Sequence, residues 1–542
     1  MPTTAHIHLW VRWYSWWQAL PTKRPYRAAL LAGFLLGLAF PPFSLAFLGW
    51  LAFPLFWRLA EAAKPLRVLY SGLLLWNLIG CYWLMLTALS APDWQEALLS
   101  LGAGAAAIVA NPLLMLLPFW LTRRLSGLLG QPFSPWLFIG AWGLFEYLHF
   151  RWELSWSWLT LGFAWSEWFP LRALGQWIGP LGISVWMLIG AAWLYQPKGW
   201  LRWAGFAVWS VGLPLGALIF PPASQAGRAR SVYAIQPNID PYTKFAEFPP
   251  DSQVQYLIRL LPAQPEPGAL IVFPETAIPI AVPLDGWKSH PYLLPFTEYA
   301  RRYQVNVLLG IVGYRFFPPG GIFPVSAHPL PEGGAYETYN AALLLRPDTY
   351  FVHIKARLVP FVERVPYLEV FSFLRRWYID LGGSFGNFGK PQALGLLRLF
   401  PDEMPLVVGI CYESIFLQDL RQRLKEGPAL LAFLTNDGWW KKSSGYYQHF
   451  TYGRLSAQVL GLPAVRSANT GISALIAEGG RVEAALPYGE AGRLEGVLWP
   501  QKPLEGYAYL GEIGWGLLVT FALSLWLRSL FPWRPSSKSS AR

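Results

Sequence analysis

The chain has 542 residues, which is enough for more than one domain. Only 14% of them are charged and 54% are hydrophobic, whereas about 25% of an average soluble chain is charged. The formal charge of +12 fits either nucleic acid or an anionic membrane surface, and the positions of the basic residues decide between the two. Two cysteines, Cys81 and Cys411, are too few for a disulfide framework.

Apolar stretches fill the first 220 residues, where only 6 of the 31 acidic residues lie. A helix needs roughly 20 apolar residues to cross a bilayer. We expect seven spans near 26–44, 46–60, 68–90, 97–121, 136–150, 178–196 and 203–220, and an eighth near 513–530. The second and fifth are short. The sequence therefore predicts a multi-pass α-helical membrane domain of about eight spans.

Basic residues fall on alternate connections between these spans. Of the 13 Lys and Arg residues before position 220, 11 precede the first span or follow the second, fourth and sixth. Because short cytoplasmic loops carry the excess of Lys and Arg, this pattern predicts that both termini are cytoplasmic. The segment between the seventh and eighth spans then lies outside. The positive charge is largely explained by the orientation of the chain in the membrane, which argues against nucleic acid as a partner.

That segment, about 225–505, has the pattern of an α/β domain. Amphipathic stretches at 251–261 and 417–425 predict helices, and short apolar runs predict strands. The predicted strands are 231–236, 269–273, 305–311, 341–345, 406–410 and 429–434. Continuous apolar strands are typical of sheets that are covered on both faces.

Polar side chains follow several of these runs directly. Glu275, Cys411 and the pair Asn436–Asp437 each come just after an apolar run, and Lys355 lies in another apolar segment. Functional residues of layered α/β domains tend to lie just past the carboxyl ends of strands. These residues are therefore candidates for one site.

A cysteine attacks as its thiolate, so a catalytic Cys411 needs a base or a positive charge nearby. Among the seven histidines, His353 and His449 are the plausible bases in this segment, and Glu275 is the alternative. Acyl transfer also needs donors for the oxyanion. Lys355 and the backbone N–H that follows Cys411 can supply them.

Four motifs together resemble those of apolipoprotein N-acyltransferases, a membrane-embedded branch of the nitrilase (carbon–nitrogen hydrolase) superfamily. They are FPETAIP (273–279), KARLVPFVERVP (355–366), GICYES (409–414) and LTNDGWW (434–440). The resemblance covers nearly the whole chain and implies an inserted nitrilase-like αββα sandwich. It implies a membrane domain at 1–220, a periplasmic catalytic domain at 221–508, and an eighth span with a basic cytoplasmic tail at 509–542.

The resemblance also implies a triad. Glu275 would be the general base, Lys355 would stabilise the tetrahedral intermediate, and Cys411 would carry the acyl chain as a thioester. Supporting roles would fall on Glu363, Tyr412 and Glu413, and substrate contacts on Phe245, Asn436 and Trp439.

The implied reaction moves an acyl chain from a phospholipid to the α-amino group of a diacylglyceryl-cysteine at the N-terminus of an apolipoprotein. It needs no metal or other cofactor, and it takes place at the bacterial inner membrane with the catalytic domain in the periplasm.

Other interpretations remain open. A membrane-tethered amidase or nitrilase would act on small amides and would need a water-accessible polar pocket. A non-enzymatic scaffold or channel would need no nucleophile, but the spans hold few charged residues besides Glu146, so no ion path is evident. Cys81, inside the third span, fits a core residue, and Asn436 and Asp437 fit turn residues that bond their own backbone.

Overall fold

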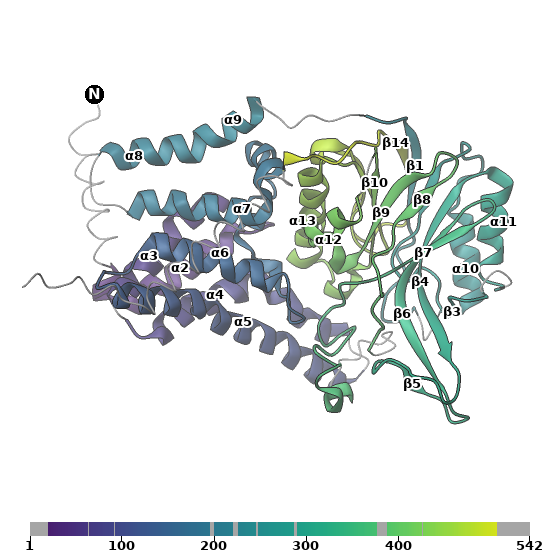
Figure 1. Cartoon of the computed structure of the whole chain (residues 1–542), viewed down its shortest axis with the longest axis horizontal. Helices are drawn as coiled ribbons and strands as arrows, with labels where there is room; N and C mark the ends of the chain where they lie inside the picture. Colours follow the sequence, from purple (N-terminus) through teal and green to yellow (C-terminus); the bar gives the residue numbers. More distant parts are fainter. Residues whose placement is uncertain are drawn as a thin grey trace, which may run out of the picture.

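The computed structural model describes a helical region, residues 20–219, and an α/β region, residues 226–506 (Figure 1). The described residues are 20–62, 64–90, 93–195, 200–219, 226–244, 248–286, 290–376, 387–424 and 427–506. The expected eighth span at 513–530 and Phe245 lie outside them.

Helices occupy each of the seven stretches expected to span the membrane. They are α2 (Pro25–Ala39), α3 (Gly49–Glu61), α4 (Leu66–Cys81), α5 (Trp94–Leu128), α6 (Pro135–His149), α7 (Phe169–Tyr195), α8 (Trp200–Ala207) and α9 (Leu213–Ile219). Within the described part of the chain, three stretches are long and apolar enough to cross a membrane: Leu66–Leu89, Trp94–Leu128 and Ala173–Tyr195. Helices α3 and α6 have only 13 and 15 residues. The number of crossings therefore stays a prediction.

Close backbone contact joins α2 to α4. A Cβ added at Gly33 would lie 1.9 Å from the carbonyl oxygen of Gly72, and one added at Gly72 would lie 2.2 Å from that of Ala29. Small residues that allow helices to approach in this way are typical of membrane bundles. Meanwhile Phe34, Leu113 and other large apolar side chains are exposed on helix surfaces, as suits contact with lipid.

Two sheets stack in the α/β region. The first has the order β14–β1–β2–β4–β6–β5, with β3 paired to β4 and β7 to β6; the second has the order β13–β12–β11–β10–β9–β8. The strands of the first are β1 (Arg230–Gln236), β2 (Leu270–Val272), β3 (Ala281–Pro283), β4 (Asn306–Phe317), β5 (His328–Pro329), β6 (Ala335–Leu345), β7 (Tyr350–Ile354) and β14 (Gly492–Leu498). Those of the second are β8 (Leu397–Leu399), β9 (Met404–Ile410), β10 (Leu430–Thr435), β11 (Ala464–Ala468), β12 (Ser473–Ile476) and β13 (Val482–Leu486). All six predicted strands are present.

Helices cover the outer face of each sheet, which makes the α/β region an αββα sandwich. Helices α10 (Pro250–Arg259) and α11 (Leu294–Tyr303) pack on the first sheet. Helices α12 (Leu417–Gln422) and α13 (Ser444–Leu460) pack on the second. A separate apolar cluster fills the space between the sheets. The layer of α12 and α13 shares its core with the helical region, so α13 lies between the sheets and the helices (Figure 1).

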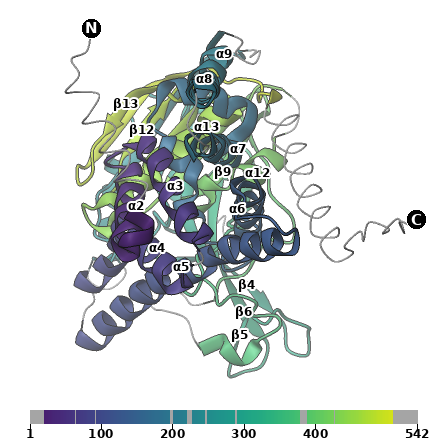
Figure 2. The same ribbon diagram turned by 90° about the vertical axis from the view of Figure 1, so that its left-hand side faces the viewer.

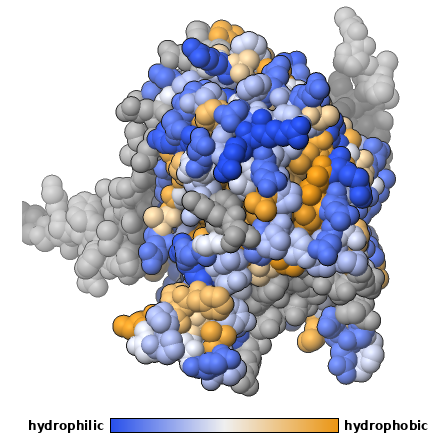
Figure 3. Space-filling model, turned by 90° about the vertical axis from the view of Figure 1, so that its right-hand side faces the viewer, coloured by the Kyte–Doolittle hydropathy of each residue, from blue (hydrophilic) through white to orange (hydrophobic). Residues whose placement is uncertain are grey.

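The two regions differ at their surfaces. Seen from the helical side, α2 to α7 lie in front of the sheets, while β4, β5 and β6 project past them at the bottom of the view (Figure 2). The opposite end of the molecule is mostly hydrophilic, with separate hydrophobic patches (Figure 3). The polar end of the α/β region therefore faces away from the apolar helices.

The chain enters and leaves the α/β region at neighbouring strands. Strands β1 and β14 pair antiparallel, with Arg230 opposite Leu498. Just outside them, the N–H of Gly227 donates to the carbonyl oxygen of Pro500 at 2.7 Å.

Candidate active site

The ends of three strands position the candidate catalytic residues. Glu275 follows β2, Lys355 comes directly after β7, and Cys411 comes directly after β9. Strands β2 and β7 belong to the first sheet and β9 to the second. The site therefore lies where the two sheets face each other at these strand ends.

Lys355 holds two carboxylates together. Its Nζ donates to Oε1 of Glu275 at 3.0 Å and to Oε1 of Glu363 at 2.8 Å. The Nδ2 of Asn340 donates to the same two oxygen atoms, each at 2.8 Å. All four residues are buried. Sequence reasoning missed Asn340, although it is the polar residue directly before the apolar run 341–345.

The electrostatics of this cluster favour a charged lysine and a neutral thiol. Burial opposes the charge of Lys355, but the carboxylates of Glu275 and Glu363 outweigh burial and raise its pKa. Burial raises the pKa of the Cys411 thiol, and Glu275 raises it further, while Lys355 opposes the shift. A thiol kept neutral in this way can act as a nucleophile only if a base removes its proton.

The backbone is in the left-handed conformation at Cys411 and next to Glu275. Cys411 has φ 48° and Thr276, next to Glu275, has φ 47°. Such left-handed residues persist only where the surroundings fix them, and they cluster at functional sites.

Glu413 ties the backbone beside Cys411 to the backbone beside Lys355. Its Oε2 accepts from the N–H of Ile410 at 2.9 Å, and its Oε1 accepts from the N–H of Ala356 at 2.7 Å. Burial opposes its ionisation, but His353, Arg423 and the Ile410 N–H lower the pKa of Glu413 to about 2.

His353 lies behind Glu413. Its Nε2 is 3.0 Å from Oε2 of Glu413, and burial lowers the pKa of the imidazole. His353 therefore supports Glu413, which makes it a poor candidate for the base that serves Cys411.

The other predicted residues have structural contacts. The hydroxyl of Tyr412 donates to the carbonyl oxygen of Ser155 in the helical region at 2.6 Å. The carbonyl oxygen of Trp439 accepts from the Tyr242 hydroxyl at 3.0 Å. Asn436 is buried, and its Oδ1 accepts from Asn469 Nδ2 at 3.2 Å, as expected of a residue that shapes a loop.

A second lysine, Lys244, lies close behind Glu275. Its Nζ donates to the carbonyl oxygen of Thr276. Burial lowers the pKa of Lys244 to about 7, and the charge of Glu275 partly opposes the shift. Sequence reasoning missed this residue, although it directly precedes Phe245.

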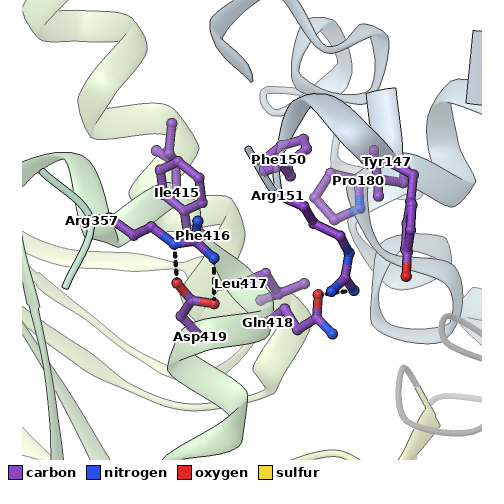
Figure 4. Close-up of a pocket in the computed structure, with 11 residues that line it drawn as sticks. Tyr147, Phe150, Arg151, Pro180, Arg357, Ile415, Phe416, Leu417, Gln418 and Asp419 are labelled. Carbon is purple, nitrogen blue, oxygen red and sulfur yellow. Dashed lines mark hydrogen bonds and ion pairs between the residues drawn. The ribbon is translucent and has the colours of Figure 1, made fainter. Parts of the chain in front are cut away.

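A cavity of about 220 Å³ lies at the boundary of the two regions (Figure 4). Arg357 bonds to Asp419 on one wall, and Arg151 bonds to Gln418 across the boundary. The remaining lining is mainly apolar: Tyr147, Phe150, Pro180, Leu181, Ile415, Phe416 and Leu417. Among the described residues, no group of three His, Cys, Asp or Glu side chains could hold a metal ion.

Two family models match successive parts of the chain. Residues 32–193 match the apolipoprotein N-acyltransferase N-terminal domain, and residues 235–498 match carbon-nitrogen hydrolase. A protein of Chlorobaculum tepidum named apolipoprotein N-acyltransferase is 28% identical over 526 residues, which cover 89% of this chain and 91% of that protein. One of Methylococcus capsulatus with the same name is 29% identical over 503 residues, which cover 89% and 92%. With both models matched in order and such relatives covering most of its length, the chain belongs to the apolipoprotein N-acyltransferase family.

Proposed function

We propose that this protein transfers an acyl chain from a phospholipid to the α-amino group of a diacylglyceryl-cysteine at the N-terminus of an apolipoprotein, through a thioester on Cys411. The observation that carries the proposal is the buried cluster in which Lys355 bonds both Glu275 and Glu363, beside Cys411. The names of the relatives support the choice of substrates.

In the first half-reaction, Glu275 takes the thiol proton as Sγ of Cys411 attacks an ester carbonyl of the phospholipid. The oxyanion is stabilised by the Lys355 ammonium and the backbone N–H of Tyr412. The tetrahedral intermediate expels the lysophospholipid alkoxide, and Glu275 returns its proton to that oxygen. The products are a lysophospholipid and the Cys411 thioester.

In the second half-reaction, the α-amino group of the acceptor attacks the thioester carbonyl. Glu275 takes a proton from the amine, the intermediate expels the thiolate of Cys411, and Glu275 returns the proton to sulfur. An amide replaces the thioester and the enzyme is regenerated. The Cys411 thioester is a more reactive acyl group than the phospholipid ester, and the amide is less reactive than either. The overall transfer from ester to amide is therefore downhill, and no nucleotide is consumed.

A membrane-attached site suits this chemistry. Exposing an acyl chain to water costs about 0.8 kcal/mol for each CH₂ group, and a catalyst at the bilayer surface avoids that exposure. We place the domain boundaries at 1–220, 221–508 and 509–542, with eight spans and the catalytic domain in the periplasm. Labelling an engineered cysteine within 225–505 with a membrane-impermeant reagent tests the orientation. Labelling in intact cells is expected, and labelling only after lysis would mean that the orientation is the reverse.

Intact-protein mass spectrometry tests the mechanism. The protein is incubated with a phospholipid that has two identical acyl chains, without acceptor. We expect one added acyl mass that neutral hydroxylamine removes. The adduct should persist in Cys81→Ala and disappear in Cys411→Ala. If the folded wild type forms no adduct and hydrolyses small soluble amides, the proposal is wrong and the protein is an amidase.

A further inference from the structure

Helix α13 contacts both the helical region and the nucleophile through two consecutive side chains. Gln448 is 1% exposed and His449 is 0% exposed. Successive residues of a helix project about 100° apart, so one rigid helix can hold two different neighbours at fixed positions.

Gln448 attaches α13 to the helical region. Its Nε2 donates to the carbonyl oxygens of Pro41 at 2.8 Å and Gly80 at 3.1 Å. Its Oε1 accepts from the indole N–H groups of Trp83 at 3.1 Å and Trp158 at 2.6 Å. These four bonds use the whole hydrogen-bonding capacity of the amide. All four partners belong to the helical region.

His449 attaches the same helix to the nucleophile. Its Nε2 lies 3.0 Å from the carbonyl oxygen of Cys411, and its Nδ1 lies 2.7 Å from Oδ1 of Asp437. Arg466 bonds the other oxygen of that carboxylate at 2.8 Å. Burial opposes ionisation of Asp437, but Arg466 and His449 outweigh it and lower the pKa of Asp437. Nε2 of His449 thus faces the carbonyl oxygen of Cys411, to which it can only donate, while Nδ1 faces Asp437 and also lies 3.3 Å from Nη2 of Arg466.

A serine completes what looks like a Ser–His–Asp triad. The Oγ of Ser414 lies 3.1 Å from Nε2 of His449. However, Ser414 is fully buried, and the same nitrogen is occupied by the Cys411 carbonyl. The arrangement therefore suits positioning, and Ser414 is not placed to attack a substrate.

The bond from His449 acts on the peptide that joins Cys411 to Tyr412. A peptide unit is planar, so fixing its C=O also fixes the direction of its N–H. That N–H, which belongs to Tyr412, is the oxyanion donor in the proposed function. Hydrogen bonding at the carbonyl oxygen also polarises the unit and strengthens the N–H as a donor. Because Cys411 has φ 48°, its conformation depends on such contacts.

We infer that Gln448 and His449 are positioning residues. Through them, the backbone conformation at Cys411 depends on how α13 packs against the helical region. The inference rests on the proposed function for the role of the Tyr412 N–H. The helical region would then have a second role besides attaching the enzyme to the membrane, because it also fixes the orientation of the peptide between Cys411 and Tyr412.

The first experiment compares two glutamines of α13 in the full-length protein with the Cys81→Ala background, so that Cys411 is the only thiol. Gln448→Met removes the four bonds to the helical region. Gln458→Met is the matched control, because Gln458 is also 1% exposed and lies on the same helix. We expect Gln448→Met to slow acyl-enzyme formation about 10-fold or more, the effect of lost hydrogen bonds, and Gln458→Met to change it less than about 2-fold. Equal rates in the two variants would overturn the coupling.

The second experiment separates positioning from stability. In His449→Gln the side-chain amide can still donate to the Cys411 carbonyl, whereas in His449→Met it cannot. Both lose the bond to Asp437, so their thermal midpoints should be similar. We expect the Gln variant to form the acyl-enzyme about 10-fold faster than the Met variant, because one hydrogen bond between neutral groups accounts for a difference of that size. Rates that simply follow the thermal midpoints would refute a positioning role.

Failure of the proposed function would be recognised separately. If the wild type forms no acyl-enzyme, the two glutamine variants are compared by the rate at which iodoacetamide alkylates Cys411. A changed rate in Gln448→Met alone would support the coupling, and equal rates would overturn it.

Discussion

Replacing Gly310 with alanine tests whether the position of Glu275 controls the reaction. Gly310 lies in β4, beside the segment that carries Glu275. An added Cβ would lie 2.2 Å from the carbonyl oxygen of Pro274, 2.6 Å from the nitrogen of Thr276 and 2.7 Å from the Cα of Glu275. All three are backbone atoms, so rotation of a side chain cannot relieve the overlap.

The size of the effect follows from these distances. Ordinary contacts begin at 3.4 Å, so β4 and the segment of Glu275 must separate by about 1 Å. Misplacing a catalytic group by that amount costs about 100-fold in rate. Overpacking costs about 1–3 kcal/mol of stability. Alanine loses less backbone entropy than glycine on folding, which offsets up to about 1 kcal/mol of that cost. We therefore expect a folded but poorly active enzyme.

The assay is the single-turnover rate of acyl-enzyme formation, measured together with the thermal midpoint in detergent. Gly492→Ala is the control, since its added Cβ would meet only the side chain of Leu486, at 3.6 and 3.8 Å. A Gly310→Ala enzyme that is folded and acylates at the wild-type rate would refute the argument that this packing holds Glu275 in place.

Three further changes probe other parts of the molecule. Arg230→Met removes two bonds to Asp402, at 2.7 and 2.8 Å, and two to the carbonyl oxygens of Gly268 and Phe400, at 2.7 and 3.1 Å. It should lower the free energy of unfolding by about 3 kcal/mol, measured by urea denaturation, and a loss below about 1 kcal/mol would show that these four bonds add little to stability. Glu413→Gln should destabilise the protein at pH 7. Because the pKa of Glu413 is lowered from 4.5 to about 2, the stability from its carboxylate is complete above about pH 4.5 and is lost as the pH falls toward 2. The gap in thermal midpoint between wild type and Glu413→Gln should therefore narrow across that range, and a constant gap would contradict the assignment. Cys81→Ala, which removes one buried sulfur atom, should cost about 1 kcal/mol of stability and leave acyl transfer unchanged; a loss of activity would show that Cys81 is more than a core residue.

The sequence predicts best the parts whose pattern follows from burial on both faces. Strands β1, β2, β9 and β10 are continuous apolar runs in the middle of the sheets, and each was predicted within a residue or two. Two of these runs, β2 and β9, are followed by Glu275 and Cys411 of the candidate site, since a polar group at a strand end is informative where the preceding residues are apolar.

The missed elements lack such a local signal. Strands β13 and β14 alternate half-buried and exposed residues and lie at sheet edges, so their sequence resembles a polar connection. Helix α13 is buried on nearly all sides, because the sheets and the helical region cover opposite faces. Its sequence QHFTYGRL (448–455) therefore has no amphipathic stripe that would mark a helix. Asn340 was missed because its partners, Glu275 and Glu363, are distant in the chain.

The pairing of β1 with β14 has a consequence for how such a protein can be assembled from parts. The two ends of the α/β region lie side by side, joined by the bond from Gly227 to Pro500. A domain with adjacent ends can be inserted between two neighbouring helices of an existing bundle without moving them apart. This geometry allows the α/β region to be inserted into a helical protein at a single point of the chain, after which the face of α13 can pack against the helices.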